Sequence, residues 1–480
     1  MHDARRARSA FPRPTLKSVV DWLFAAKWRL GHWVVALLWL AAMLAVQWKV
    51  GQGFITQANQ NVTQYNQDAY LGLAKANLPF VWPAFTDGIR TPLFPFLIKA
   101  WASDDNAQFF AAAKQANVCF GLIATALLAF YFWWKLPLLP ALNVGTISAL
   151  IILPASVFVT AEAVYYTAFF FFWVVGWRLL VENPLRSYAL AGLLCAATYL
   201  AKPSTLLLSV CLVALSLVRW IQVERSGTED ITWTGRRFLI GAVVFYVSFL
   251  VPVLPKAYDM YQRAGDPFQN ASEYCFWMDD WQQCIPRLRD FSANKVKQMP
   301  PAERPSAVNY WQHHTRDQIW NRMTSGMLEQ AHNLLFAEKS LKNFLRPGPQ
   351  LRIVLPVRGA YLVALLLGTL LLATQGATGK SRTQADRRTL WALAALGFTA
   401  HFLAISFYTP ITGGDRLILA IYIPVLFSLA MGIEYLREER SHGWRVAAVQ
   451  LIHLLIAGQL VWQLVHLSTV ATFGEPRGAM

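Results

Sequence analysis

The sequence predicts an all-α polytopic membrane protein, with about eleven transmembrane helices and two longer loop regions outside the membrane that contain interfacial helices. Hydrophobic residues make up 55% of the 480-residue chain and charged residues only 15%, whereas ordinary globular proteins carry about 25% charged residues. Long segments, such as residues 118–134 and 361–374, contain no charged side chain. The 20 Trp residues suit anchoring at the two membrane–water interfaces.

The apolar segments are long enough to cross the hydrocarbon layer once their flanks are counted, because about 18 apolar residues span it as a helix. The first segment follows a basic N-terminus and lacks a small-residue cleavage site, so we interpret it as a span and not as a signal peptide. The expected spans are residues 31–50, 112–134, 141–159, 163–181, 187–201, 203–220, 238–254, 356–375, 390–408, 416–436 and 444–466.

The positions of the basic residues predict the orientation of the chain. With a cytoplasmic N-terminus, the short basic loops all lie inside, and the C-terminus lies outside. These loops are at residues 135, 178–186, 219–237, 380–388 and 437–445. The net charge of +16 therefore indicates membrane topology, and no nucleic-acid partner is expected.

Two long segments fall outside the membrane and divide the chain into three parts. These parts are an N-terminal transmembrane module (1–254) with a first loop at about 51–110, a large external subdomain (255–355), and C-terminal transmembrane helices (356–480).

Local patterns predict helices and one cysteine pair in these loops. The first loop contains helical stretches at 68–76 and 90–101, and the second of these fits an interfacial helix. In the second loop, apolar residues recur at helical spacing over 309–344. Cys275 and Cys284 also lie there, and an oxidising compartment allows a disulfide between them, with two free thiols as the alternative.

Ionisable side chains gather at the outer ends of the expected spans and in the first loop. They are Asp68, Asp87, Arg90, Glu162, Lys202, Asp415 and Arg416. In a folded bundle these side chains lie at one depth, where carboxylates and cations together suit a site that binds a phosphate and activates a nucleophile.

Five segments around these positions resemble the GT-C class of membrane glycosyltransferases, in the order in which that class has them. They are residues 66–74 (NQDAYLGLA), 87–97 (DGIRTPLFPFL), 160–165 (TAEAVY), 201–205 (AKPST) and 414–424 (GDRLILAIYIP). The class includes the lipid A aminoarabinose transferase and the protein O-mannosyltransferases, which use polyprenyl-phosphate sugars on the external face of the membrane. The resemblance implies an inverting enzyme of a bacterial inner membrane with a periplasmic active site. It would transfer a monosaccharide from a polyprenyl-phosphate donor to a cell-envelope glycan or lipid.

The resemblance also implies roles for individual residues. Asp68 matches the catalytic first-loop acid and is expected to act as general base, and Glu162 is the second candidate for a catalytic carboxylate. Lys202 stands where the class usually has an Arg. The residues expected to bind substrate or donor phosphate are Tyr70, Asp87, Arg90, Lys202 and Arg416. Some relatives bind a divalent metal ion and others do not, so a metal cofactor stays open.

Each of these residues also has a structural interpretation. Asp68 is placed to cap the helix that follows it, and Asp87 to form an Asp-Gly turn and pair with Arg90. Glu162 can be solvated at the membrane interface, and Lys202 can extend toward it.

Two other functions remain open for the whole chain. An O-antigen ligase or polymerase would use polyprenyl-pyrophosphate glycans, with His332 as its loop histidine. A transporter or flippase would place charges or broken helices at the membrane midplane, and the sequence shows no clear sign of either.

Overall fold

The computed structural model is built from helices, and the residues that it describes contain no strand. The described residues are 15–25, 27–63, 66–76, 86–226, 235–284, 293–336, 356–373, 382–411, 417–438 and 443–470. Among them, nine helices are long and apolar enough to cross a membrane, and two shorter apolar helices, Leu185–Ala201 and Arg358–Leu370, accompany them. The chain is an all-α polytopic membrane protein.

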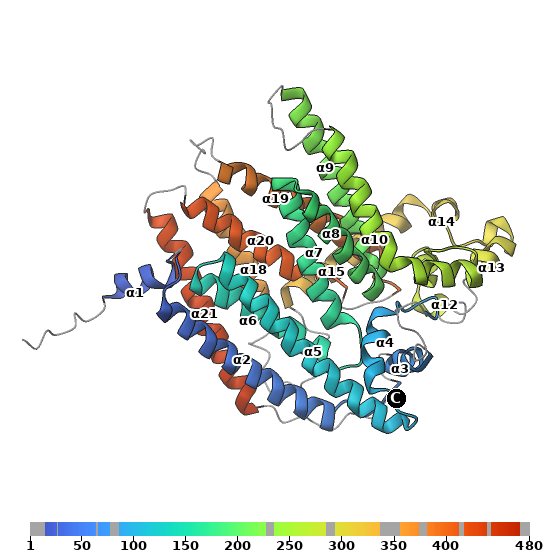
Figure 1. Ribbon diagram of the computed structural model, residues 1–480, viewed down its shortest axis with the longest axis horizontal. Helices are drawn as coiled ribbons and strands as arrows, with labels where there is room; N and C mark the ends of the chain where they lie inside the picture. Colours follow the sequence, from blue (N-terminus) through green and yellow to red (C-terminus); the bar gives the residue numbers. More distant parts are fainter. Residues whose placement is uncertain are drawn as a thin grey trace, which may run out of the picture.

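The long helices coincide with the expected spans (Figure 1). They are α2 (Leu30–Gln57), α5 (Asn106–Lys135), α6 (Leu138–Ser156), α7 (Glu162–Glu182), α8 (Leu185–Ala201), α9 (Leu206–Ser226), α10 (Gly235–Ala264), α18 (Pro356–Ala373), α19 (Arg382–Tyr408), α20 (Leu419–Glu438) and α21 (Trp444–Val470). Helix α10 continues ten residues beyond the expected end at residue 254. Its last turns remain helical because Ala257, Met260 and Ala264 are buried there.

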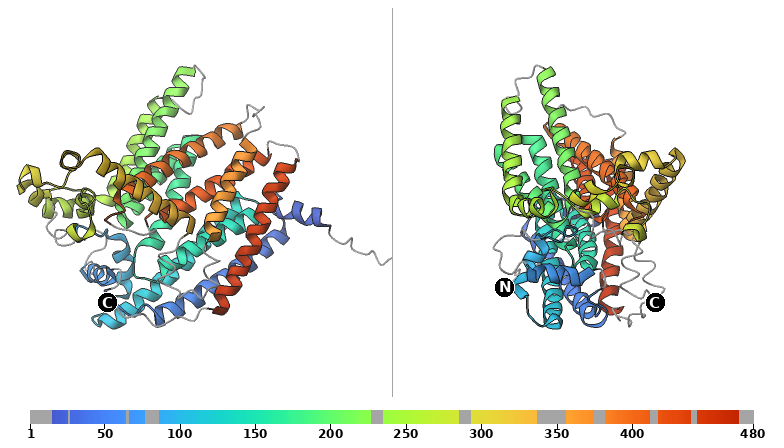
Figure 2. Two further views of the ribbon diagram at one scale, coloured as in Figure 1. Left: turned by 180° about the vertical axis from the view of Figure 1, so that it is seen from behind. Right: turned by 90° about the vertical axis from the view of Figure 1, so that its right-hand side faces the viewer.

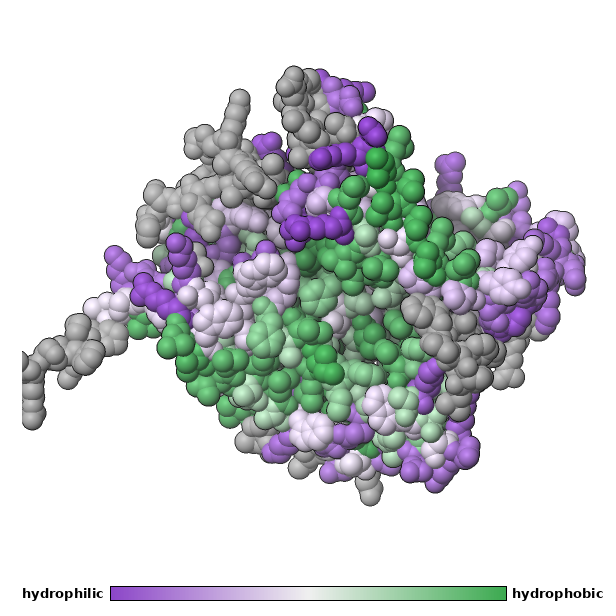
Figure 3. Space-filling view, viewed as in Figure 1, coloured by the Kyte–Doolittle hydropathy of each residue, from purple (hydrophilic) through white to green (hydrophobic). Residues whose placement is uncertain are grey.

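The outer surfaces of these helices expose apolar side chains. In α10, Val243, Val251 and Leu254 are 62%, 65% and 63% exposed. Figure 3 shows hydrophobic surface spread over the bundle, with hydrophilic residues gathered toward its ends. In water this surface would be an unusually large apolar patch, whereas in a bilayer it contacts acyl chains.

Aromatic side chains of α7 fill the centre of the bundle. Phe169, Phe170, Phe172 and Trp173 are fully buried in the main hydrophobic cluster. The indole N–H of Trp173 donates to Ser428 Oγ of α20 at 3.1 Å, which satisfies the polar group inside the core.

Shorter helices occupy the two segments that were expected outside the membrane. They are α3 (Gln67–Ala76) and α4 (Leu93–Ile98) in the first segment, and α11 (Ala271–Cys275), α12 (Trp281–Cys284), α13 (Ala293–Gln298), α14 (Ala307–His313) and α15 (Arg316–Phe336) in the second. Figures 1 and 2 show α3, α4 and α12 to α14 at one end of the molecule, and α1 (Leu16–Leu23) at the other. We call the first of these the outer end, as expected for two segments on the same side of a membrane.

The prediction of one helix over residues 309–344 is wrong, because the structure has two helices, α14 and α15, in this range. Thr315, between α14 and α15, accepts a hydrogen bond through Oγ1 from the backbone N–H of Gln318 at 3.3 Å. Gln318 Oε1 accepts one in return from the backbone N–H of Thr315 at 2.8 Å. This reciprocal capping box starts a new helix. Residues 337–344 lie outside the described residues.

Candidate functional site

Six of the predicted site residues lie at the outer end, and we call them the span-end cluster. They are Asp68, Tyr70, Asp87, Arg90, Glu162 and Lys202. Arg416 and its neighbour Asp415 lie outside the described residues. The six come from three separate parts of the chain, so the contacts that hold these parts together define the site.

Glu162 and Lys202 form a buried ion pair between two spans. Helix α7 begins at Glu162, and Lys202 directly follows the last residue of α8. Lys202 Nζ donates to Glu162 Oε1 at 2.7 Å, and the side chains are only 15% and 7% exposed. The ring of Tyr165 lies 5.9 Å from Lys202 Nζ. Glu162 is therefore not simply solvated at an interface, and its charge is balanced inside the protein.

Asp87 forms the turn that was expected as its structural alternative. Its Oδ1 accepts from the backbone N–H groups of Ile89 at 2.9 Å and Arg90 at 2.7 Å. Gly88 has a φ of +84°, a conformation that glycine adopts without strain. Asp87 Oδ2 also pairs with Arg90 Nη1 at 2.5 Å. The guanidinium carbon of Arg90 lies 5.8 Å from the ring centre of Tyr70, so the turn directs this cation toward α3.

Hydrogen bonds attach this turn to the bundle. The hydroxyl of Thr91 donates to the carbonyl of Ala201 at 2.6 Å, which joins the residue after Arg90 to the residue before Lys202. On its other side, the carbonyl of Gly88 accepts from the backbone N–H of Ala271 at 2.7 Å. The turn is thus held between the end of α8 and the second external segment.

Asp68 is exposed because its neighbour Gln67 is fixed inward. The buried Gln67 accepts through Oε1 from the backbone N–H of Val159 at 2.8 Å and exchanges hydrogen bonds with Asn59. Asp68 lies in the first turn of α3, where the helix dipole favours a carboxylate, so it is not the residue that precedes the helix. No described residue forms a hydrogen bond or ion pair with its carboxylate. The carboxylate of Asp68 is therefore exposed and has no partner among the described residues.

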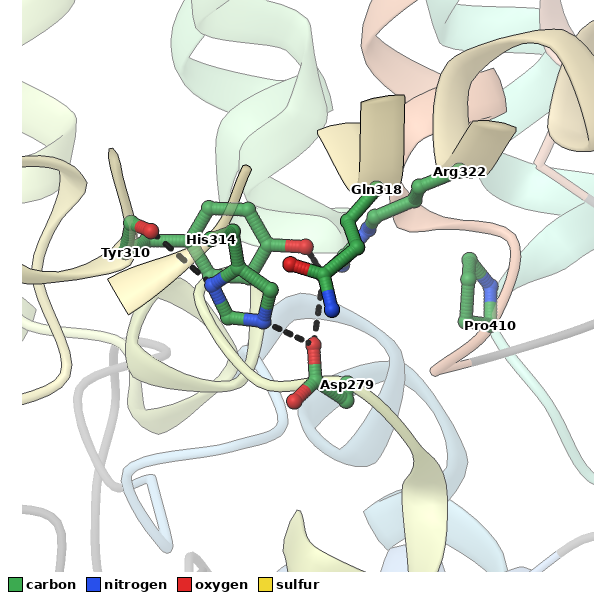
Figure 4. Close-up of a pocket in the computed structure, with 6 residues that line it drawn as sticks. All are labelled: Asp279, Tyr310, His314, Gln318, Arg322 and Pro410. Atoms are coloured by element: carbon green, nitrogen blue, oxygen red, sulfur yellow. Dashed lines mark hydrogen bonds and ion pairs between the residues drawn. The ribbon is translucent and has the colours of Figure 1, made fainter. Parts of the chain in front are cut away.

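A second constellation lies in the second external segment, and we call it the loop pocket. It is a cavity of about 260 Å³ lined by Asp279, Tyr310, His314, Gln318, Arg322 and Pro410 (Figure 4). His314 Nε2 lies 2.9 Å from Asp279 Oδ1. The imidazole also stacks on the ring of Tyr310, with centroids 4.0 Å apart and planes inclined by 19°.

Arg322 and a disulfide hold the walls of the loop pocket. The buried guanidinium of Arg322 donates through Nε to the carbonyl of Phe407 at 2.8 Å, and through Nη1 to the carbonyl of Met278 at 2.7 Å. These bonds connect α15 with α19 and with the residue before Asp279. Cys275 and Cys284, the pair expected to form a disulfide, are linked, with Cα atoms 5.6 Å apart. The linked segment carries Asp279.

Sequence reasoning missed the loop pocket. Asp279 and His314 are 35 residues apart, and no spacing in the sequence indicates that they share a cavity. The available signal was the Thr-x-x-Gln pattern at residues 315–318, which ends one helix and places His314 at a junction. Across the described ranges, no group of three or more His, Cys, Asp or Glu side chains is placed to hold a metal ion.

No protein-family model and no curated protein matches this sequence. Among solved structures, the chain is similar to the oligosaccharyltransferase of Archaeoglobus fulgidus. The apo form matches with a TM-score of 0.43 and 12% identity over 92% of this chain and 56% of that one. A complex of AglB from the same organism with an inhibitory peptide and a dolichol-phosphate matches with a TM-score of 0.43 and 11% identity, over 94% and 57%. The chain spans little more than half the length of these proteins.

Proposed function

We propose that this protein is an inverting glycosyltransferase of the GT-C type. It transfers a monosaccharide from a polyprenyl-phosphate donor to a cell-envelope glycan or lipid on the periplasmic face of a bacterial inner membrane. The observation that carries this proposal is the place of the Arg90 turn at the outer end of a membrane-spanning bundle. The turn is bonded to the end of α8 beside Lys202 and faces Tyr70 of α3, the helix that also carries Asp68. A lipid-linked donor bound there keeps its tail in the bilayer while its phosphate and sugar reach the site.

Arg90 is the residue we assign to the donor phosphate. Its Nη1 pairs with Asp87, and no described acceptor takes its remaining N–H groups apart from the Tyr70 ring that it faces. A guanidinium held by such a turn can donate two parallel hydrogen bonds to phosphate oxygens. It would stabilise the negative charge that grows on the phosphate as the sugar leaves.

Asp68 is the residue we assign to the acceptor. Its carboxylate removes the proton from an acceptor hydroxyl while that oxygen attacks the anomeric carbon. The bond between the anomeric carbon and the phosphate oxygen breaks, and both of its electrons stay with the polyprenyl phosphate. Asp68 then returns the proton to solvent.

The Glu162–Lys202 pair has a positioning role in this proposal. It fixes the end of α8 against the start of α7, and the Thr91–Ala201 hydrogen bond places the Arg90 turn against the same end. The pair therefore sets where Arg90 stands relative to the membrane.

The test is transfer of radiolabelled sugar by the purified full-length protein in nanodiscs. Synthetic polyprenyl-phosphate monosaccharides and polyprenyl-pyrophosphate oligosaccharides are supplied in parallel, with envelope extract as acceptor. We expect transfer from a monosaccharide donor. Transfer from the pyrophosphate donors alone would assign a ligase or polymerase, and no transfer from either would contradict the enzymatic function.

A further inference from the structure

We propose that the loop pocket binds a neutral, hydroxyl-rich sugar ring. In the context of the proposed function, on which this part of the inference rests, that ring belongs to the acceptor. The pocket lies in the second external segment and is distinct from the span-end cluster, and the reaction described above does not use it.

The size of the pocket fits one ring. Its volume is about 260 Å³, just below the range of about 300–1,000 Å³ that is usual for drug-sized ligands. A single monosaccharide unit fits such a space, and a longer glycan would extend through the open side.

The lining offers both partners that a hydroxyl group needs. The carboxylate of Asp279 is 51% exposed and accepts hydrogen bonds. The carbonyl oxygen of Gln318 is occupied by the backbone N–H of Thr315, and no acceptor among the described residues takes its NH₂ group. Since each sugar hydroxyl donates one hydrogen bond and accepts others, an acceptor and a donor in one cavity suit it.

The charges of the pocket favour a neutral ligand over an anion. Arg322 lies 3.9 Å from Asp279, so the cation and the carboxylate balance each other. The N–H groups of Arg322 are already directed at backbone carbonyls and at the hydroxyl of Tyr310. A phosphate would therefore meet a carboxylate and few available cationic donors.

His314 orients the pocket and does not act as a base. Its Nδ1 lies 2.9 Å from the carbonyl of Tyr310, and its Nε2 lies 2.9 Å from Asp279. Both ring nitrogens thus have oxygen partners within the protein, so neither nitrogen is directed at a ligand. The pocket therefore recognises a ligand without exchanging protons with it.

One hydrophobic cluster joins the pocket to the span-end cluster. It contains Ile89, Met278 and Ile411. Ile89 precedes Arg90, Met278 precedes Asp279, and Ile411 follows Pro410. Packed side chains therefore connect the pocket with the turn that carries Arg90, the proposed phosphate-binding residue.

The test is saturation-transfer NMR on the full-length protein in nanodiscs, with the methyl glycosides of glucose, galactose, mannose and N-acetylglucosamine as probes at millimolar concentration. We expect at least one glycoside to bind. Asp279→Asn should weaken its affinity about tenfold or more, because a hydrogen bond to a charged group is lost. The matched control is Asp280→Asn, since Asp280 is adjacent in sequence and does not line the pocket.

Gln318→Glu keeps the result interpretable if Asp279→Asn perturbs folding. A Glu at this position preserves the capping box, but it replaces the NH₂ donor with an acceptor oxygen and adds a negative charge beside Asp279. We therefore expect weaker glycoside binding with little change in the thermal unfolding midpoint. Failure of every glycoside to bind, equal binding by both pocket variants and wild type, or competition by inorganic phosphate would overturn the proposal. Glycoside binding without transferase activity would contradict only the proposed function, whereas transferase activity without glycoside binding would contradict only this inference.

Discussion

The span-end cluster and the loop pocket are held together in different ways. In the cluster, Glu162 and Lys202 stand where two apolar helices end, and the membrane depth of those ends places them side by side. No membrane surface fixes the positions of the loop-pocket residues in this way. Its residues come from positions 279, 310–322 and 410, and a disulfide and the buried Arg322 hold them in place.

The two regions differ in how much of each the sequence of a membrane protein reveals. Where an apolar run stops, the next charged residue has a predictable depth, so the amino-acid sequence alone indicates candidates for the cluster. A site built from loop segments depends on tertiary contacts that no periodicity encodes. Variants that damage one region and spare the other test this difference.

Loss of the buried ion pair should have the largest effect on stability. Lys202→Met leaves Glu162 without its Lys partner in a buried position, which we expect to lower the free energy of unfolding by about 3–5 kcal/mol. Thermal unfolding of the purified protein measures this effect. The double variant with Glu162→Gln should recover most of the loss. Equal stability of the single and double variants would show that the pair is not a structural unit.

Gly326→Ala should damage the loop pocket and spare the span-end cluster. A Cβ atom at Gly326 would lie 1.9 Å from the backbone oxygen of Ser406 in α19, so α15 must move away. We expect a cost of about 3 kcal/mol and loss of glycoside binding.

The matched control for that variant is Gly72→Ala in α3, where a Cβ meets nothing within 4 Å. Because Ala favours helix over Gly, this change should stabilise the protein by up to about 1 kcal/mol. Retained glycoside binding in Gly326→Ala would contradict the docking of α15 as the support of the pocket.

Removal of the disulfide should loosen the pocket more than the bundle. Cys275 and Cys284 are nine residues apart, and closing a loop of this length stabilises a fold by about 2.5 kcal/mol in the chain-entropy model. We expect the double Cys→Ser variant to be cleaved faster by protease within residues 271–284, with weaker glycoside binding. Unchanged cleavage and binding would show that Arg322 alone holds this segment.

The sequence predicted the bundle more fully than the outer end. Each expected span lies largely within one helix because burial in lipid requires long apolar runs. The sequence also predicted the turn at Asp87, since an Asp-Gly pair is typical of turns. The ion pair of Glu162 with Lys202 was not foreseen, because two span ends 40 residues apart reveal no partner by their spacing. The break at Thr315 was missed because apolar periodicity continued across it.

The smallest expected effect concerns Glu273 of α11. Burial raises the pKa of this carboxyl above its ordinary value of 4.5, and the nearby Asp266 raises it further. The folded state therefore keeps its proton longer than the unfolded state, so stability falls as the pH rises from 4.5 to the raised pKa. Glu273→Gln should remove this decline, which thermal unfolding at a series of pH values measures. A wild-type unfolding midpoint that rises with pH over this interval, with the rise absent in Glu273→Gln, would contradict the raised pKa of Glu273.

We propose that the exposed carboxylate of Asp68 serves the reaction at the outer end. The most direct test compares Asp68→Asn with Asp104→Asn, an exposed acid of the same external segment, in sugar transfer from a polyprenyl-phosphate donor. We expect Asp68→Asn to fold normally and to lose about 100-fold or more in rate, as removal of a general base does, and Asp104→Asn to match the wild type. A wild-type rate in Asp68→Asn would contradict the role of Asp68 as general base.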